Sequence, residues 1–317
     1  MRPAWPLALL LLFSVTGRAN AAEPCVFRVS DNTWTLDADC TVDASIVIPD
    51  GITLDGAQHT IIAIDPPDGP FRGGIIVNGG ASASVANTVI TALMLSRVCL
   101  DGSDRLRAIY FNGASGVIRG NTILNVNKSP SGCQEGNGIE VRNIDLFGPP
   151  ATVDISENLI EGFQKTGVVV SGNVNAGIRA NSIGPSSAQR LMVTNGVQVG
   201  AGARASIEGN TIAGNSWTGS DAAATAILLL NTAAGTLVRG NVIFGNADVG
   251  IYVMANGVRV ERNRLTDTGT DGTFDVGIGN YGEGNVFEDN IIKGFHFRYQ
   301  NVDEPDPSPG NATIAAR

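Results

Sequence analysis

The feature that most constrains the fold is a short unit that recurs from about residue 45 to about residue 295. Its clearest copy is Gly250 to Leu265, where a Gly-Ile-x-Val segment precedes a second segment that ends in Asn-x-Leu. The distance from the Gly or Ala that opens a copy to this Asn is 13 residues in four copies and 14 or 15 in three. Spacing held so closely indicates a repeat architecture.

Each copy contains two apolar runs with period-two alternation, which are too short for helices and are bounded by Gly, Asn and Ser. No single copy can bury its apolar face, so the copies are predicted to stack around one continuous core. The repeated Asn fits a tight corner, because Asn tolerates a left-handed backbone and its amide can bond the next coil. It recurs as Asn87, Asn121, Asn158, Asn181, Asn210, Asn241, Asn263 and Asn290.

Short parallel strands, an Asn ladder and linkers of variable length together resemble the right-handed parallel β-helix proteins of the pectate-lyase-like superfamily. That superfamily includes pectate lyases, polygalacturonases and alginate epimerases. The resemblance predicts an all-β fold, a single-stranded right-handed parallel β-helix of about nine coils over residues 45–300. The Gly-His-Gly signature of polygalacturonases and the Asp-Pro-His run of alginate epimerases are both absent from the sequence. No characterised enzyme family is therefore indicated, since one fold hosts many activities.

The two ends of the chain differ in composition from the repeat. Residues 1–21 have the charge pattern, the apolar centre and the Ala19-Asn20-Ala21 site of a cleavable signal peptide, which predicts a secreted or periplasmic protein. No later apolar run is long enough to span a membrane. Residues 22–44 are predicted to cap the open end of the helix with a disulfide-closed hairpin, and residues 301–317 to form a disordered tail.

The charge balance argues against a nucleic-acid partner. The formal net charge is −9, and removal of residues 1–21 would leave 19 basic and 30 acidic residues. There is also no basic patch with interleaved aromatic residues. A polysaccharide or a cell-surface glycan is the partner that the family resemblance implies, although a polyuronate would be repelled unless calcium bridged it to the protein.

Four cysteines remain in the mature chain, and an even number in an exported protein suggests disulfides. Of the three possible connectivities we favour Cys25 with Cys40 and Cys99 with Cys133, since each joins near neighbours in the repeat. Zinc binding is disfavoured because no Cys-x-x-Cys spacing occurs.

In enzymes of the resembled fold the substrate lies along the first parallel sheet, which corresponds here to the Gly-Ile-x-Val strands. Strand alternation predicts that Ile76 faces outward on an early coil. It also places four polar side chains outward on the next two coils, and stacking makes them neighbours: Tyr110, Asn112, Glu140 and Arg142. The adjoining linkers add charged residues, in a wall that a Cys99–Cys133 disulfide would make rigid: Asp104, Arg107, Lys128, Glu135 and Lys165.

Two chemistries fit these residues. β-Elimination would use Lys165 or Arg142 as the base and Tyr110 as the acid. Glycoside hydrolysis would use Glu140 with Glu135 or Asp104 as paired carboxylates. A third reading is that these charges are only solvated, as is usual on exposed sheets. The predicted function is that of a polysaccharide lyase or glycoside hydrolase, and the alternative is a non-catalytic β-helix module that binds glycan or protein.

Other residues extend the predicted binding surface. Gln198 and Tyr252 face outward on later coils, and Trp217 lies near Tyr252 by coil order, so that all three are expected to contact substrate. A calcium site is a second hypothesis, with Asp267, Asp271 and Asp275 as ligands in one linker. Because that linker lacks a complete calcium-binding motif, a solvated loop is the favoured reading.

Overall fold

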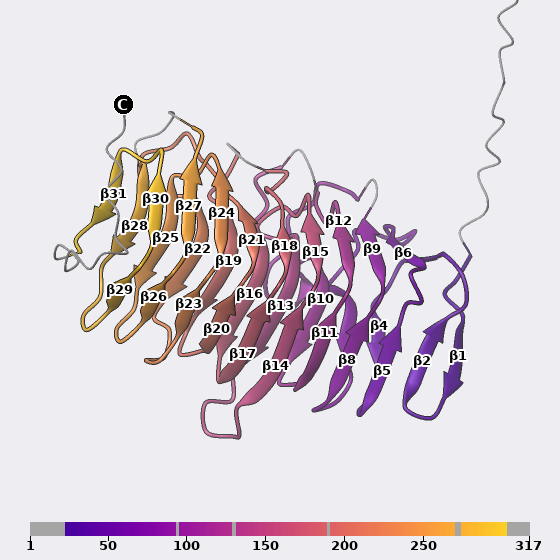
Figure 1. Cartoon of the computed structure of the whole chain (residues 1–317). Coiled ribbons are helices and arrows are strands. Elements are labelled where there is room, and N and C mark those ends of the chain that lie inside the picture. The colour runs from indigo at the N-terminus through magenta and orange to yellow at the C-terminus, as the bar shows by residue number, and fades with distance from the viewer. Residues whose placement is uncertain (1–22, 93–94, 129–130, 189–190, 270–273, 303–317) are drawn as a thin grey trace, which may run out of the picture.

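The computed structural model describes residues 23–92, 95–128, 131–188, 191–269 and 274–302. These residues form 31 β-strands and one 3₁₀ turn, η1 (Gly102–Asp104), in three long sheets that run side by side (Figure 1). From β2 onward consecutive strands enter different sheets, and every third strand returns beside its predecessor in parallel. Within the described residues no helix is long and apolar enough to cross a membrane.

Sheet 1 contains ten strands: β4 (Ile46–Ile48), β7 (Gly74–Asn78), β10 (Arg107–Asn112), β13 (Asn137–Asn143), β16 (Thr166–Gly172), β19 (Asn195–Gly200), β22 (Thr225–Leu230), β25 (Val249–Met254), β28 (Val276–Asn280) and β31 (Phe297–Gln300). Sheet 2 contains eleven: β1 (Phe27–Ser30), β2 (Thr33–Leu36), β5 (Ile52–Asp55), β8 (Ala83–Ala86), β11 (Gly116–Arg119), β14 (Ala151–Ser156), β17 (Val174–Arg179), β20 (Arg204–Glu208), β23 (Leu237–Arg239), β26 (Arg259–Glu261) and β29 (Val286–Glu288). Sheet 3 contains ten: β3 (Cys40–Val42), β6 (Thr60–Ala63), β9 (Val89–Ala92), β12 (Thr122–Leu124), β15 (Leu159–Glu161), β18 (Ser182–Ile183), β21 (Thr211–Ala213), β24 (Val242–Gly245), β27 (Arg264–Asp267) and β30 (Ile291–Lys293).

The core is a stack of apolar side chains from successive coils. Ile109 pairs with Ile139, which pairs with Val168, and all three are fully buried. Each coil is stable because the neighbouring coils cover its apolar face. One coil alone would leave this face in water. The predicted fold class, a parallel β-helix, is thereby confirmed.

One predicted orientation is wrong. Ile76 was expected to face outward, but it pairs with Ile109 in the core and is fully buried. Val77, not Ile76, stands in register with Tyr110. The Gly-Ile-x-Val pattern of this coil is therefore displaced by one residue, and a one-residue shift moves a side chain to the opposite face of the strand.

The Asn ladder lies at the corner between sheets 2 and 3 and is buried. At each step the Oδ1 of one Asn accepts the backbone N–H and the side-chain amide of the Asn on the preceding coil, as at Asn181 and Asn210, with both distances 2.9 Å. The amide of Asn210 also donates to the carbonyl of Ile178 at 2.9 Å. The ladder thus satisfies backbone groups that a tight corner would otherwise leave unpaired.

The ladder differs from the prediction in two ways. Thr88, not Asn87, occupies the ladder position on its coil, and its backbone N–H donates to Asn121 Oδ1. The left-handed residue is the one before the ladder Asn, with φ of 65° at Gly120 and 57° at Glu157. Asn87 has φ of 51° and takes this left-handed position, for which Asn is well suited.

The N-terminal segment forms the predicted antiparallel hairpin, in which β1 pairs with β2 and β2 continues into sheet 2 beside β5. A disulfide joins Cys25 to Cys40, as predicted. The second predicted disulfide, Cys99–Cys133, is also present. The signal peptide predicted at residues 1–21 lies outside the described residues, as does most of the predicted tail at residues 301–317.

Candidate functional site

The outer face of β10 and β13 brings four predicted site residues together. Tyr110 stands in register with Glu140, and Asn112 stands in register with Arg142. The alternation of the strands places these residues on the face opposite the core, as predicted. The polar square inferred from the spacing of the repeats is therefore present.

Glu140 at the centre of this square is not free to act as an acid or a base. Its Oε2 lies 2.6 Å from Arg107 Nε and accepts a hydrogen bond of 2.9 Å from the Asn137 amide. Arg107 also donates to the backbone carbonyls of Ser103 and Arg105. Arg107 is only 1% exposed and Glu140 only 6% exposed. The predicted roles of Glu140 in catalysis and Arg107 in substrate binding are corrected to a buried ion pair beneath the surface.

Lys128 and Glu135 also need correction. Both side chains are fully buried, and Lys128 Nζ lies 3.1 Å from Glu135 Oε2. The Glu135 carboxylate accepts the backbone N–H groups of Leu100 and Leu106, each at 2.8 Å. Neither residue can reach a substrate, and their role is to join two linkers.

The disulfide and this ion pair build the wall that was expected beside sheet 1. Cys99–Cys133 connects the linker before β10 to the linker before β13. The Gln164 side chain, which precedes β16, donates to the Cys133 carbonyl at 2.7 Å and accepts the Lys128 N–H at 2.6 Å. Three successive linkers are thus tied together, which gives the wall a fixed shape.

A pair of carboxylates for glycoside hydrolysis is not available at this site. Glu135 is buried in the wall, and Glu140 is bound by Arg107. Asp104, the remaining predicted partner, lies in η1 and forms an exposed ion pair with Arg72 at 2.7 Å. Hydrolysis needs one free acid and one free base or nucleophile across the scissile bond, so the geometry disfavours this chemistry.

Lys165 lies immediately before β16 and is half-buried. Burial, together with the charge of the nearby Arg105, lowers the pKa of its ammonium group to about 8. Lys165 Nζ donates to the Val193 carbonyl at 2.6 Å. Arg105 was not among the predicted site residues, although it lies two positions before Arg107 in a linker rich in charges. Its Nε atom is buried, with no hydrogen-bond partner in the part of the chain that the structure describes.

Arg142 lies at the opposite edge of sheet 1 from Lys165. The backbone N–H of Lys165 donates to Gly136, which precedes Arg142 by six residues along the same strand direction. Six residues of extended strand span roughly 20 Å. The Arg142 Nε is likewise buried without a partner among the described residues. Of the four residues predicted to be catalytic, Tyr110, Glu140 and Arg142 therefore lie together on β10 and β13, whereas Lys165 lies at the other edge of the sheet.

An apolar loop beside Arg142 was not predicted. Ile144, Leu146 and Phe147 follow β13 and are all exposed, with Phe147 wholly so. The loop before β14 protrudes beyond the neighbouring turns (Figure 1). Asp145 holds its shape, because its Oδ1 accepts the backbone N–H groups of Phe147 and Gly148. Exposed apolar groups on a structured loop commonly mark a binding surface.

The remaining predicted binding residues lie farther along the molecule. Gln198 faces outward and accepts a hydrogen bond from the Asn195 amide at 3.1 Å. Tyr252 packs edge-on against Tyr281, with ring centroids 5.2 Å apart. Trp217 lies in the linker before β22, where its backbone N–H donates to the Asp248 carboxylate. The ring partner of Tyr252 is thus Tyr281.

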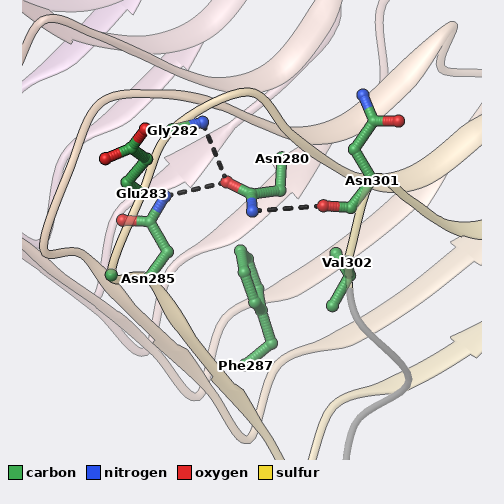
Figure 2. A pocket seen from close by; sticks show the side chains of 8 residues that line it. Asn280, Gly282, Glu283, Asn285, Phe287, Asn301 and Val302 are labelled. Carbon is green, nitrogen blue, oxygen red and sulfur yellow. Dashed lines mark hydrogen bonds between the residues drawn. The ribbon is translucent and has the colours of Figure 1, made fainter.

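A cavity of about 450 Å³ lies near the C-terminal end of the described chain. Figure 2 shows that the Asn280 amide occupies its centre. Asn280 Oδ1 accepts hydrogen bonds from Gly282 and Asn285, and its Nδ2 donates to the Asn301 carbonyl. These bonds hold the last turns together, and they occupy the amide that a ligand would otherwise bind.

Two of the three predicted calcium ligands, Asp267 and Asp275, lie within the described residues. Asp267 is buried, and its Oδ1 accepts the Ala247 N–H at 3.0 Å. Burial raises the pKa of Asp267, and the charge of Asp275 raises it further. Asp271 lies outside the described residues. Among the residues that are described, no three His, Cys, Asp or Glu side chains gather as metal ligands, and the calcium site stays a prediction.

Comparison with known proteins gives one family match. A family model described as a right handed beta helix region matches residues 146–302. No curated protein matches the sequence. This match agrees with the sheet topology and gives the handedness of the coil.

Several solved structures resemble the chain. A Dettilon tailspike protein shares 13% identity at a TM-score of 0.48, over 82% of this chain and 55% of that one. XylC in complex with xylose shares 16% identity at a TM-score of 0.47, over 83% of this chain and 45% of that one. The periplasmic alginate epimerase AlgG shares 13% identity at a TM-score of 0.39, over 87% of this chain and 80% of that one. The chain spans about half the length of the first two proteins. At these identities the likeness concerns the fold alone.

Proposed function

We propose that this right-handed parallel β-helix repeat protein binds an acidic polysaccharide across sheet 1 and cleaves it by β-elimination, with Lys165 as the base. The observation that carries the proposal is that two cationic side chains, Lys165 and Arg105, lie close enough to repel each other. Among the described residues neither has a carboxylate partner, and the pKa of Lys165 is about 8. A general base works best when its pKa lies near the working pH, and mutual repulsion with a neighbouring cation is one way to lower it.

The reaction would need three groups. Arg105 would bind the uronate carboxylate and stabilise the charge that develops when the C5 proton leaves. Neutral Lys165 would accept that proton, the C4–O bond would break, and a C4=C5 double bond would form. Tyr110 lies on β10, and its hydroxyl would return a proton to the departing oxygen, which balances the reaction.

The surroundings of Lys165 suit such a role. The disulfide-linked wall fixes the linkers on this side. The backbone of Arg105 is also held, because its carbonyl accepts a hydrogen bond from the Arg107 guanidinium. The buried Arg107–Glu140 pair adds no net charge. An acidic substrate would therefore meet a local excess of positive charge on a protein that is negative as a whole.

The two disulfides are typical of proteins that fold outside the cytoplasm. Together with the predicted signal peptide at residues 1–21, they support our proposal that the protein is exported to the periplasm or secreted. An extracellular or periplasmic location would bring the protein into contact with polysaccharides of cell surfaces.

The test is incubation with polymers of galacturonate, mannuronate, guluronate and glucuronate, followed by the ultraviolet absorbance of the new double bond. We expect Lys165→Ala to reduce the rate by about 10²–10⁴-fold. The matched control is Lys293→Ala, because Lys293 is exposed on sheet 3. Cleavage that survives Lys165→Ala would refute the proposed base.

A non-catalytic binding module is the second candidate. The hydrogen bond from Lys165 to the Val193 carbonyl favours it, since that bond holds the ammonium form. Binding of an acidic polymer, with no unsaturated product from any of the four, would support this candidate and refute the lyase.

A further inference from the structure

A second cavity opens at the turns that follow β22 and β25. Its volume is about 380 Å³. Its lining comes from the turn after β22, from the end of β25 with the turn that follows it, and from Tyr281. The residues that line it share one property, the absence of charge: Asn231, Thr232, Ala234, Met254, Ala255, Asn256 and Tyr281.

The lining combines a ring and a thioether with amide and hydroxyl groups. Tyr281 is half exposed, and Met254 is also exposed at the surface. Asn231 is exposed on the turn, beside Thr232. A sugar ring has an apolar C–H face and a rim of hydroxyls, so that it matches an aromatic surface flanked by amides. A site without charge selects a neutral ligand, because a charged one would lose its hydration without gaining an ion pair.

Thr232 provides an independent indication that a hydroxyl-rich ligand belongs here. It is only 8% exposed, and its Oγ1 has no hydrogen-bond partner within the described ranges. A buried hydroxyl without a partner is costly, so that it calls for a functional explanation.

The aromatic side of the cavity is held in place. The Tyr281 hydroxyl contacts Gln300 Oε1 at 3.1 Å, and the Tyr281 ring packs against Tyr252. Both rings converge above Gly279, where an added methyl group would lie 3.4 Å from the Tyr252 ring and 3.7 Å from the Tyr281 ring. These contacts fix the Tyr281 ring, and a fixed ring loses little entropy on binding.

The cavity lies on the same line of residues as Arg142. Arg142 pairs with Ser171, Ser171 with Gly200, Gly200 with Leu230, and Leu230 with Met254. Four strand spacings separate Arg142 from Met254, which is roughly 19 Å. A polysaccharide that follows this line would pass Arg142 first and reach the uncharged cavity a few sugar units later.

We infer that this cavity is a binding site for a neutral sugar unit of the same glycan, at a distance from Lys165 and Arg105. The inference rests on the proposed function for the identity of the chain that reaches the cavity. The binding of an uncharged sugar by Tyr281, Thr232 and Asn231 does not depend on cleavage. The natural substrate would then be a heteropolysaccharide that contains both acidic and neutral units.

The test is isothermal titration calorimetry of the full protein with neutral hexasaccharides: 1,4-linked glucose, xylose, mannose and N-acetylglucosamine. We expect at least one of the four to bind. Tyr281→Ala should weaken that binding about tenfold or more, while Tyr281→Phe retains most of it, because the ring provides the stacking surface. Thr232→Val should weaken it about fivefold by removing one hydrogen bond.

Two controls separate this inference from the proposed lyase. Thr194→Val removes another buried hydroxyl without a partner, away from the cavity, and should leave neutral binding unchanged. Lys165→Ala should abolish cleavage of acidic polymers and also leave neutral binding unchanged. Thermal denaturation without ligand checks that Thr232→Val folds, since loss of an unpaired hydroxyl should not lower the melting temperature.

The outcomes divide cleanly. Neutral binding that falls in Tyr281→Ala and Thr232→Val but persists in Lys165→Ala supports the cavity, even where no acidic polymer is cleaved. Absence of binding by all four hexasaccharides, or binding that both cavity variants retain in full, overturns the inference and leaves the proposed lyase standing.

Discussion

Arg107 Nε lies 2.6 Å from Glu140 Oε2, although 33 residues separate them in the chain. One residue comes from β10 and the other from β13, so that a single step of the coil brings them together. The pair is almost fully buried, and the Arg107 guanidinium also lies 4.4 Å from the centre of the Tyr110 ring. It therefore fixes the position of Tyr110 while removing Glu140 from the set of available acids.

Loss of Arg107 should destabilise the fold strongly. In Arg107→Met the Glu140 carboxylate stays buried without a cation, and breaking a buried pair in this way costs about 3–5 kcal/mol. We expect the free energy of unfolding, measured in urea, to fall by that amount. The double variant Arg107→Met/Glu140→Leu should recover most of it, because no buried charge remains. If Arg107→Met lowers the free energy of unfolding by less than about 1 kcal/mol, the pair behaves like an ion pair at the surface.

The middle of the Asn ladder should be sensitive to truncation. Asn210→Ala removes the acceptor for two donors of Asn181 and the donor to Ile178. With about 1–3 kcal/mol for each buried group left unsatisfied, we expect a loss of roughly 2–4 kcal/mol after local relaxation. Asn175→Ala is the control, since Asn175 is exposed on β17 and should change stability by less than about 0.5 kcal/mol. Equal effects of the two substitutions in urea denaturation would contradict a structural role for the ladder.

Lys165 should make stability depend on pH above neutrality. Its folded pKa of about 8 lies below its usual value of 10.5, so that between these values the unfolded state binds more protons than the folded state. The free energy of unfolding should therefore rise with pH from about 8 to about 10.5. In Lys165→Met this contribution disappears, and the difference between wild type and variant should grow across the same window. Parallel stability curves for the two proteins would show that the pKa is not lowered.

The same pKa predicts the pH profile of cleavage. If neutral Lys165 is the base, the rate at low substrate concentration should increase with pH and level off above about 8. A profile governed by a group that titrates near pH 4 would point instead to a carboxylate. The profile is measured by ultraviolet absorbance on the polymer that is cleaved fastest.

The Cys99–Cys133 disulfide should stabilise the wall beyond the buried Lys128–Glu135 pair. The two cysteines are 34 residues apart, for which loop-closure entropy gives roughly 3–4 kcal/mol. We expect Cys99→Ser/Cys133→Ser to lower the free energy of unfolding by about that much and to retain the far-ultraviolet circular dichroism of the wild type. Unchanged stability would mean that the ion pair and Gln164 alone hold the linkers.

The sequence predicted the stacking of coils and most of the register, because both follow from a period. The spacing of Gly-Ile-x-Val segments was enough to place Tyr110 beside Glu140 and Asn112 beside Arg142. The cysteine pairs followed from the same reasoning. The pattern failed by one residue at Ile76 and Asn87, on a coil where Thr88 replaces the ladder Asn and two adjacent Ile residues obscure the alternation.

What the sequence by itself determined is thus which strands stack and which faces are buried, since alternation and repetition act through the backbone. Only the tertiary structure decided which charges are free. Arg107, Lys128 and Glu135 belong to linkers and strand ends that follow no period. Arg107 buries its charge against Glu140 of the next coil, and Lys128 and Glu135 bury theirs against each other within one linker. Such pairing depends on the torsion angles that long side chains adopt within a packed wall. Residue spacing contains no information about those angles.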